Sequence, residues 1–217
     1  METRSLRQTR IEIGFGEGVI DGIMCGPEEM RPPMPGVVVA HPHPLLGGNA
    51  DHPVVYAICR ELAELGIMSL RFNFTVGTQD TESLLTSAAR ELVHATQAIG
   101  QWDFVSKKRI GVAGFSFGAA SILRTLPELD NVAAVSLLAP PVNAVTRSTL
   151  GEMSRPRQVV VGTADKLVNP TELEGVIRQL DDTIQFETIP DADHNFSYTS
   201  DEVAKTAALF LAEQLTR

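Results

Sequence analysis

The stretch RIGVAGFSFGAASILRTL, residues 109–126, combines a predicted strand, a sharp turn and a predicted helix. The strand covers 109–115 and the helix covers 118–126, where Pro127 ends it. Between them stands Gly-Phe-Ser-Phe-Gly, and a serine in a Gly-x-Ser-x-Gly turn of this kind has a strained backbone that exposes its hydroxyl. The following helix directs its positive N-terminal end at Ser116, which favours negative charge nearby. The stretch therefore predicts that Ser116 is a nucleophile.

The rest of the chain alternates strand-like and helix-like segments, without an internal repeat or a long linker. This alternation predicts an α/β protein with a mainly parallel sheet covered by helices on both faces, and its first two strands predict an antiparallel start. The length of 217 residues suits one domain, which we expect to cover 1–217. The predicted strands are 8–13, 19–25, 36–40, 67–74, 109–115, 132–138, 158–161 and 183–189, and the predicted helices are 51–65, 81–101, 118–126, 170–180 and 201–215.

Two later turns carry residues that can activate Ser116. Asp165 follows the predicted strand 158–161, and His194 follows the predicted strand 183–189. The carboxyl ends of parallel strands meet at one edge of a sheet, so these side chains can converge on the serine although they are distant in sequence.

The chemistry of these residue types predicts a Ser116–His194–Asp165 catalytic triad. Histidine takes the serine proton and later delivers it to the leaving group, while an aspartate holds the imidazole tautomer and stabilises the imidazolium. Asp191 and Asp193 are alternative acids. Both are too close to His194 in sequence to present a carboxylate easily to its Nδ1, so Asp165 is preferred.

The segment HPHPLLGG, residues 41–48, follows the predicted strand 36–40 and is suited to an oxyanion hole. Such a hole needs a main-chain N–H from a loop in this place and another from the residue after the nucleophile, here Phe117. The two prolines have no N–H to donate and stiffen the loop. The loop donor is therefore predicted to be His43, with Leu45 as the second choice.

The histidines of this region also allow a metal site. His41 and His43 share a face if the loop is extended, and His52 and Asp51 lie nearby. The two prolines fit a rigid anion-binding loop better, and no carboxylate pair suits a hydrolytic metal. We therefore predict no metal and no cofactor.

Composition narrows the possible partners and location. Eighteen basic and twenty-seven acidic residues give a formal charge of −9, which disfavours nucleic acid as a partner. No apolar run approaches the ~20 residues that a membrane-spanning helix needs, and no apolar segment follows residues 1–10 as it would in a signal peptide. The two cysteines, Cys25 and Cys59, lack metal-type spacing and are expected to be reduced and buried. These features predict a cytoplasmic protein.

With these motifs, the sequence resembles the dienelactone-hydrolase-like branch of the α/β-hydrolase superfamily, above all its small, lidless bacterial serine hydrolases with a His-Pro-His-Pro loop. The resemblance implies an α/β-hydrolase fold with an eight-stranded sheet and a minimal cap, and it places Ser116, Asp165 and His194 at the family's catalytic positions. The chain departs from the pattern at Thr75-Val76-Gly77-Thr78, where relatives usually have Arg-Gly-x-Gly. The likeness extends from Val37 to about Leu211, with anchors at 41–48, Arg71-Phe72-Asn73-Phe74, 114–118, 162–165 and His194.

The predicted function is hydrolysis of carboxylic esters, thioesters or lactones through an acyl-serine intermediate, with a small-molecule ester as the partner. Residues 140–156, where many relatives insert a helical lid, have room for only about one short helix, so small acyl groups are expected. Two alternatives stay open, a serine peptidase of the same fold and a non-catalytic binding module. Labelling by a fluorophosphonate distinguishes an enzyme from a non-catalytic binding module. A comparison of ester and amide substrates then distinguishes an esterase from a peptidase.

Overall fold

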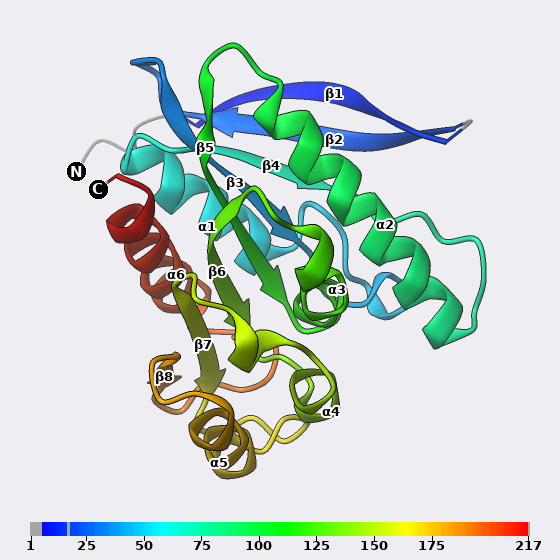
Figure 1. Ribbon diagram of the computed structural model, residues 1–217, viewed down its shortest axis with the longest axis vertical. Helices are drawn as coiled ribbons and strands as arrows, with labels where there is room; N and C mark the ends of the chain where they lie inside the picture. Colours follow the sequence, from blue (N-terminus) through cyan, green and yellow to red (C-terminus); the bar gives the residue numbers. More distant parts are fainter. Residues whose placement is uncertain (1–5, 17, 217) are drawn as a thin grey trace.

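Eight strands form one sheet in the computed structural model, which describes residues 6–16 and 18–216. The order of the strands is β1-β2-β4-β3-β5-β6-β7-β8 (Figure 1). Within the same residues, six α-helices and three short 3₁₀ helices connect or follow the strands. The strands are β1 (Arg7–Phe15), β2 (Gly18–Gly26), β3 (Met34–Ala40), β4 (Met68–Phe72), β5 (Val105–Phe115), β6 (Val132–Leu138), β7 (Arg157–Gly162) and β8 (Gln185–Ile189). The helices are α1 (Pro53–Glu64), α2 (Thr81–Gly100), α3 (Phe117–Thr125), α4 (Val142–Thr146), α5 (Pro170–Leu180), α6 (Ser200–Leu215), η1 (Pro44–Leu46), η2 (Leu126–Glu128) and η3 (Leu150–Glu152).

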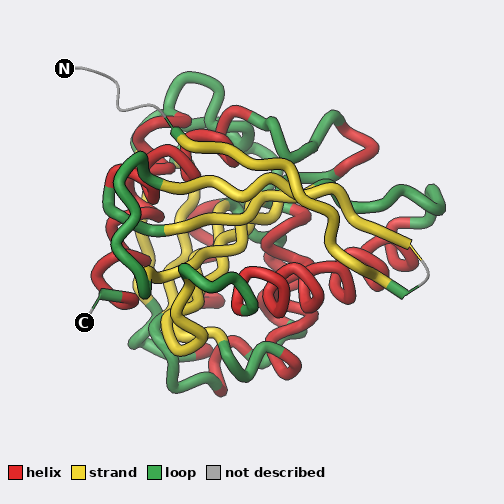
Figure 2. The backbone as a smooth tube through the Cα atoms, turned by 90° about the horizontal axis from the view of Figure 1, so that it is seen from above, coloured by secondary structure: helices red, strands yellow, loops and turns green. Residues whose placement is uncertain are grey.

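The sheet is parallel from β4 through β3 and β5 to β8 and antiparallel at its start. β1 pairs with β2, and β2 with β4, in antiparallel register, whereas all later pairs are parallel. The two antiparallel strands cross one edge of the sheet and project beyond it, as the view from above shows (Figure 2). The predicted α/β architecture and its antiparallel beginning are confirmed.

Helices cover both faces of the sheet and enclose two apolar cores. All seven residues of β3 are buried, and their alternation divides them between the cores. Val38 packs in the core beneath α2 and α3, whereas Val37 and Val39 pack in the core beneath α1 and α6. The ribbon shows α1 and α6 side by side on one face and α2 to α5 on the other (Figure 1).

Capping side chains explain where the helices begin. The helix predicted at 51–65 begins at Pro53, because the His52 side chain caps it by accepting from the Val54 N–H. Asp80 caps α2 by accepting from the Ser83 N–H at 2.8 Å.

None of the helices in the described part of the chain is both long and apolar enough to cross a membrane.

Only β6 has the predicted bounds, and the differences at β5 and β4 have identifiable causes. β5 begins at Val105, not at 109, because Val105 pairs with Met34 beyond a register shift and polar residues follow it. β4 ends at Phe72, two residues before the predicted end, because the chain turns away from the sheet within two residues. The Asn73 N–H still bonds to the Asp21 carbonyl of β2 at 3.1 Å, whereas the Phe74 N–H bonds to the side chain of His41 at 3.0 Å.

Candidate active site

Ser116 occupies the turn between β5 and α3 with a strained backbone. Its φ of +52° lies in the left-handed region that non-glycine residues rarely adopt. The Ser116 N–H bonds to the Leu138 carbonyl at 2.8 Å, which ties the turn to the end of β6. A Cβ at Gly118 would lie 2.4 Å from the Ala40 carbonyl oxygen, so no other residue fits this approach of α3 to β3. The predicted nucleophile turn thus has the expected geometry.

Three side chains from the carboxyl edge of the sheet form a hydrogen-bonded series. Ser116 Oγ lies 3.0 Å from His194 Nε2, and His194 Nδ1 lies 2.8 Å from Asp165 Oδ2. The carboxylate accepts from the Nδ1–H, so Nε2 is left to accept from the serine hydroxyl. The structure therefore brings together the three residues predicted from the sequence, in the order that proton transfer requires.

Asp165 is a buried and well-bonded carboxylate. Its side chain is held by the His194 imidazole on Oδ2 and by the N–H groups of Leu167 and Val168 on Oδ1, both at 2.8 Å. Burial by itself raises the pKa of this carboxyl, but these hydrogen bonds lower it by more, so the pKa of Asp165 is below its ordinary value. It remains ionised while facing the imidazole.

The alternative acid Asp193 has another role in the structure. It is exposed, and its two oxygens accept from the Ser197 N–H at 2.9 Å and the Ser197 hydroxyl at 2.8 Å. Asp193 therefore stabilises the turn after His194, whereas Asp165 contacts the imidazole.

The loop after β3 brings His43 to the same site. His43 lies beside Phe117, with ring centroids 4.8 Å apart, and both residues line the cleft at Ser116. Phe117 is the first residue of α3, so its N–H has no acceptor within the helix. The Leu45 N–H, the second choice as oxyanion donor, is already directed at His43 Nδ1 at 3.3 Å. The arrangement favours His43 as the loop donor.

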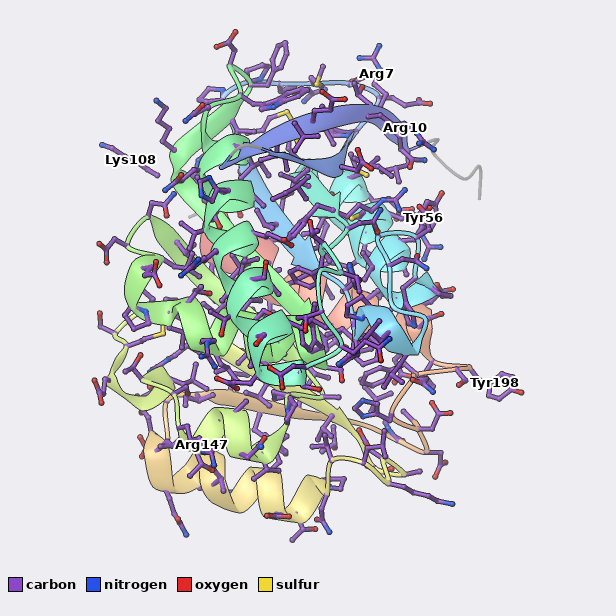
Figure 3. All side chains as sticks on the ribbon, turned by 90° about the vertical axis from the view of Figure 1, so that its right-hand side faces the viewer. Arg7, Arg10, Tyr56, Lys108, Arg147 and Tyr198 are labelled. Carbon is purple, nitrogen blue, oxygen red and sulfur yellow. The ribbon has the colours of Figure 1, made fainter. Side chains whose placement is uncertain are left out.

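A cleft of about 920 Å³ opens at Ser116. The cleft is lined by Leu85 of α2, by Phe117 and Leu123 of α3, and by residues of α4 with the following Arg147. Arg147 is labelled beside α4 in Figure 3. Two leucines at the cleft, Leu46 and Leu167, are 84% and 78% exposed, so its mouth is open to solvent. Of the two phenylalanines beside the serine, Phe117 lines the cleft, whereas Phe115 is buried behind His194 with ring centroids 5.8 Å apart.

Comparison with known proteins agrees with this geometry. A family profile described as an alpha/beta hydrolase domain matches residues 34–214. The chain belongs to this family.

Relatives of this hydrolase share the fold over nearly their whole length. The chain is similar to XC6422 from Xanthomonas campestris, described as a serine hydrolase without a lid, with a TM-score of 0.80, 23% identity and coverage of 97% and 96% of the two chains. It is also similar to a dienelactone hydrolase from Anabaena variabilis, with a TM-score of 0.77, 19% identity and coverage of 97% and 99%. An uncharacterized protein from Rickettsia prowazekii, RP471, is 29% identical over 202 residues, which are 87% of this chain and 82% of the relative. The predicted resemblance is confirmed.

The residues of the predicted metal alternative have other partners in this hydrolase. His41 is buried, with Nδ1 at 2.6 Å from the Pro42 carbonyl oxygen and Nε2 at 3.0 Å from the Phe74 nitrogen. His52 caps α1, and Asp51 pairs with Arg71. Among the described residues, no group of three or more His, Cys, Asp or Glu side chains is arranged to hold a metal ion.

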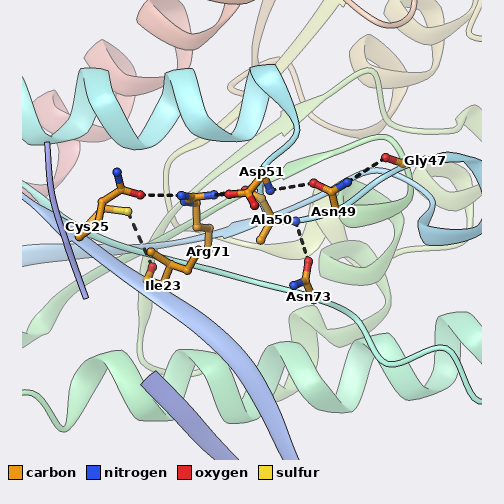
Figure 4. A network of polar contacts seen from close by, with 9 residues as sticks. Ile23, Cys25, Gly47, Asn49, Ala50, Asp51, Arg71 and Asn73 are labelled. Atoms are coloured by element: carbon orange, nitrogen blue, oxygen red, sulfur yellow. Dashed lines mark hydrogen bonds and ion pairs between the residues drawn. The ribbon is translucent and has the colours of Figure 1, made fainter. Parts of the chain in front are cut away.

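A buried arginine network, not predicted from the sequence, anchors the end of the same loop (Figure 4). Arg71 donates to the Ala50 carbonyl at 2.6 Å, to Asp51, and to Gln8 on β1 at 2.7 Å. Asn73 accepts from the Ala50 N–H at 2.8 Å. The segment Arg71-Phe72-Asn73-Phe74, noted in the sequence only through the resemblance, thus holds the loop between β3 and α1.

The two cysteines are free and buried, as expected, and they adjoin this network. A hydrogen bond with Cys59, supported by the Arg71 guanidinium and opposed by burial, lowers the pKa of Cys25 to about 7. The interaction of the two thiols was not predictable from the sequence, because one lies on β2 and the other on α1.

Burial of His41 has a consequence for stability. Desolvation is the main cause that lowers its pKa from 6.5 to about 4, with a further contribution from the charge of His52. Between these values the unfolded chain binds a proton at His41 and the folded chain does not, so the free energy of unfolding rises with pH across this interval. We expect His41 to contribute up to about 3 kcal/mol to this rise.

Urea unfolding of the wild type and His41→Asn, at several pH values from 4 to 7, measures this contribution. The difference in unfolding free energy between the two proteins should grow in favour of the wild type as the pH rises. A difference that stays constant with pH would show that His41 titrates alike in the folded and unfolded chains.

Proposed function

We propose that this hydrolase cleaves carboxylic esters, thioesters or lactones through an acyl-serine intermediate. The observation that carries the proposal is the hydrogen-bonded series from Ser116 Oγ through His194 to Asp165, at distances of 3.0 and 2.8 Å. Ser116 lies on a strained turn, beside a cleft that is large enough for a small organic substrate.

The proposed reaction follows from the hydrogen bonds of these groups. His194 Nε2 takes the hydroxyl proton as Ser116 Oγ attacks the carbonyl carbon, while Asp165 stabilises the imidazolium. The N–H groups of His43 and Phe117 bind the oxyanion. His194 then gives its proton to the leaving alkoxide or thiolate, which departs and leaves the acyl-serine. Water, deprotonated by His194, attacks this ester and releases the acid.

A fluorophosphonate probe tests the proposal directly. It should label the wild type at Ser116, because only an activated serine hydroxyl attacks phosphorus, and it should leave Ser116→Ala unlabelled. Turnover of an ester and of a matched amide then separates an esterase from a peptidase. Labelling without hydrolysis of either substrate class, or no labelling at all, would contradict the proposal.

The acyl group is proposed to be small. A fully buried methylene stabilises a complex by only ~0.8 kcal/mol, and one in an open cleft by less. Leu46 and Leu167 leave the mouth of the cleft exposed. We therefore expect kcat/KM for p-nitrophenyl esters to be highest between acetyl and butyryl chains.

The apolar wall of the cleft provides the control for chain length. If kcat/KM instead rises steadily to eight carbons, a long chain binds along Leu85 and Leu123. In that case Leu85→Asn should lower the ratio of octanoyl to acetyl activity, which would overturn the assignment to small acyl groups.

The proposed setting is the cytoplasm, with a small-molecule ester as the partner. The two buried, unpaired cysteines support this location, since free thiols persist in a reducing compartment.

A further inference from the structure

His41 is a buried titratable side chain that the proposed reaction does not use. It is 1% exposed and lies at the end of β3, where its ring packs against Phe74 with centroids 4.7 Å apart. A carbonyl oxygen can only accept, so Nδ1 donates to Pro42, and an amide N–H can only donate, so Nε2 accepts from Phe74. His41 is therefore a neutral imidazole with the proton on Nδ1 and with both nitrogens bonded.

The hydrogen bond from His41 to the Pro42 carbonyl also determines the orientation of the next main-chain N–H. The carbonyl of Pro42 and the N–H of His43 belong to one planar peptide unit, which is trans. In a trans peptide these two groups point in opposite directions. Because His41 holds the Pro42 oxygen at 2.6 Å, it also directs the N–H of His43 away from itself.

Gly48 lies close to the same Pro42 carbonyl. A Cβ at Gly48 would lie 2.1 Å from the Pro42 oxygen and 2.8 Å from the His43 oxygen. The Gly48 N–H donates to the His43 carbonyl at 3.0 Å. The carbonyl of the peptide between residues 42 and 43 is thus held by the imidazole of His41 and packed against the backbone of Gly48.

We propose that His41 is a positioning residue of the oxyanion hole, which holds the 42–43 peptide so that the His43 N–H, and not the Pro42 carbonyl, faces the reacting oxygen. The inference rests on the proposed function. If the peptide turned over, a carbonyl oxygen would face the developing negative charge and repel it, and one donor would be lost. Binding of the uncharged ester would change little, because the oxyanion exists only in the transition state and the tetrahedral intermediate.

Two substitutions of His41 separate its two hydrogen bonds. Asparagine places an amide group near the position of Nδ1, so His41→Asn retains a donor to the Pro42 carbonyl. Glutamine places its amide group near the position of Nε2, so His41→Gln retains only an acceptor for the Phe74 N–H. We expect His41→Gln to lower kcat by about 10²- to 10³-fold, as loss of one oxyanion donor does, with KM changed less than about threefold. His41→Asn should keep kcat within about tenfold of the wild type.

A trifluoromethyl ketone distinguishes positioning from a general structural effect. Ser116 adds reversibly to its carbonyl carbon, so the carbonyl oxygen becomes an oxyanion in the hole. The affinity of His41→Gln for this inhibitor should fall by the same factor as kcat/KM, because the adduct mimics the transition state. The control is Ser136→Ala, which removes a buried hydrogen bond to Gln158 on β7 at 3.0 Å and should leave both quantities unchanged.

A second variant applies if His41→Gln fails to fold. In Gly48→Ala the added Cβ would displace the Pro42 carbonyl of the same peptide, so this variant should lower kcat and inhibitor affinity together. A kcat within threefold of the wild type in the folded His41→Gln, or in Gly48→Ala, would overturn the inference while the proposed function stands. An inactive wild type that no fluorophosphonate labels would instead overturn the proposed function.

Discussion

Replacing Ser116 with alanine should lower kcat/KM for p-nitrophenyl acetate by about 10⁴-fold or more. In a serine protease, loss of the nucleophile alone reduces kcat by ~10⁶, and what remains comes from the oxyanion hole and substrate binding. The hydroxyl bonds to His194 at 3.0 Å and lies at the cleft, so its removal leaves no buried group without a partner inside the core. We expect the thermal midpoint to change by only a few degrees.

A serine one helical turn later provides the control for this substitution. Ser121 is buried on α3, and its hydroxyl donates to the Phe117 carbonyl at 2.9 Å without contacting the cleft. Ser121→Ala should retain kcat/KM within about threefold. If Ser116→Ala kept activity within tenfold of the wild type, Ser116 would not be the nucleophile.

Asp165→Asn should reduce kcat by about 10⁴-fold, the size of the same change in a serine protease. The reason lies in the hydrogen bonds on the other oxygen. The N–H groups of Leu167 and Val168 donate to Oδ1, so the carbonyl oxygen of an asparagine must occupy that position. Its NH₂ group then faces His194 Nδ1 and forces the proton onto Nε2, which can no longer accept from Ser116.

The matched control is Asp193→Asn on the turn beside His194. Asp193 contacts Ser197, and an asparagine oxygen can still accept from the Ser197 N–H. Steady-state kinetics with the same ester should show a loss of less than about threefold. If Asp193→Asn were the more damaging change, Asp193 would be the acid of the triad.

The elements that were predictable from the sequence are those with a local signal. The strand, glycine turn and helix around Ser116 adjoin in the chain, and the steric reason for Gly118 is visible in the motif itself. Asp165 and His194 could be assigned because each follows a predicted strand, and parallel strands end at one edge of a sheet. The α/β fold could be predicted because segments with the hydrophobic period of a strand alternate with segments that have the period of a helix.

What was not predictable depends on contacts between distant segments. The order of the strands places β4 between β2 and β3, and only the folded sheet shows that Arg71 on β4 reaches Gln8 and Ala50. His41 was assigned in the sequence only to a metal alternative, because its partner Phe74 lies 33 positions away. The wall of the cleft at Leu85 was missed because helical periodicity marks it only as one more apolar residue of α2.

The cleft is lined by turns at the sheet edge and by helices, and this division suggests how its substrate specificity can change in evolution. The reacting groups stand on turns at the sheet edge, fixed by buried hydrogen bonds and by close backbone approaches. The start of α2 and α4 also line the cleft, and an ion pair between Glu82 and Arg124 joins α2 to α3. Substitutions in these outer helices can therefore exchange one substrate for another while the reaction is inherited unchanged.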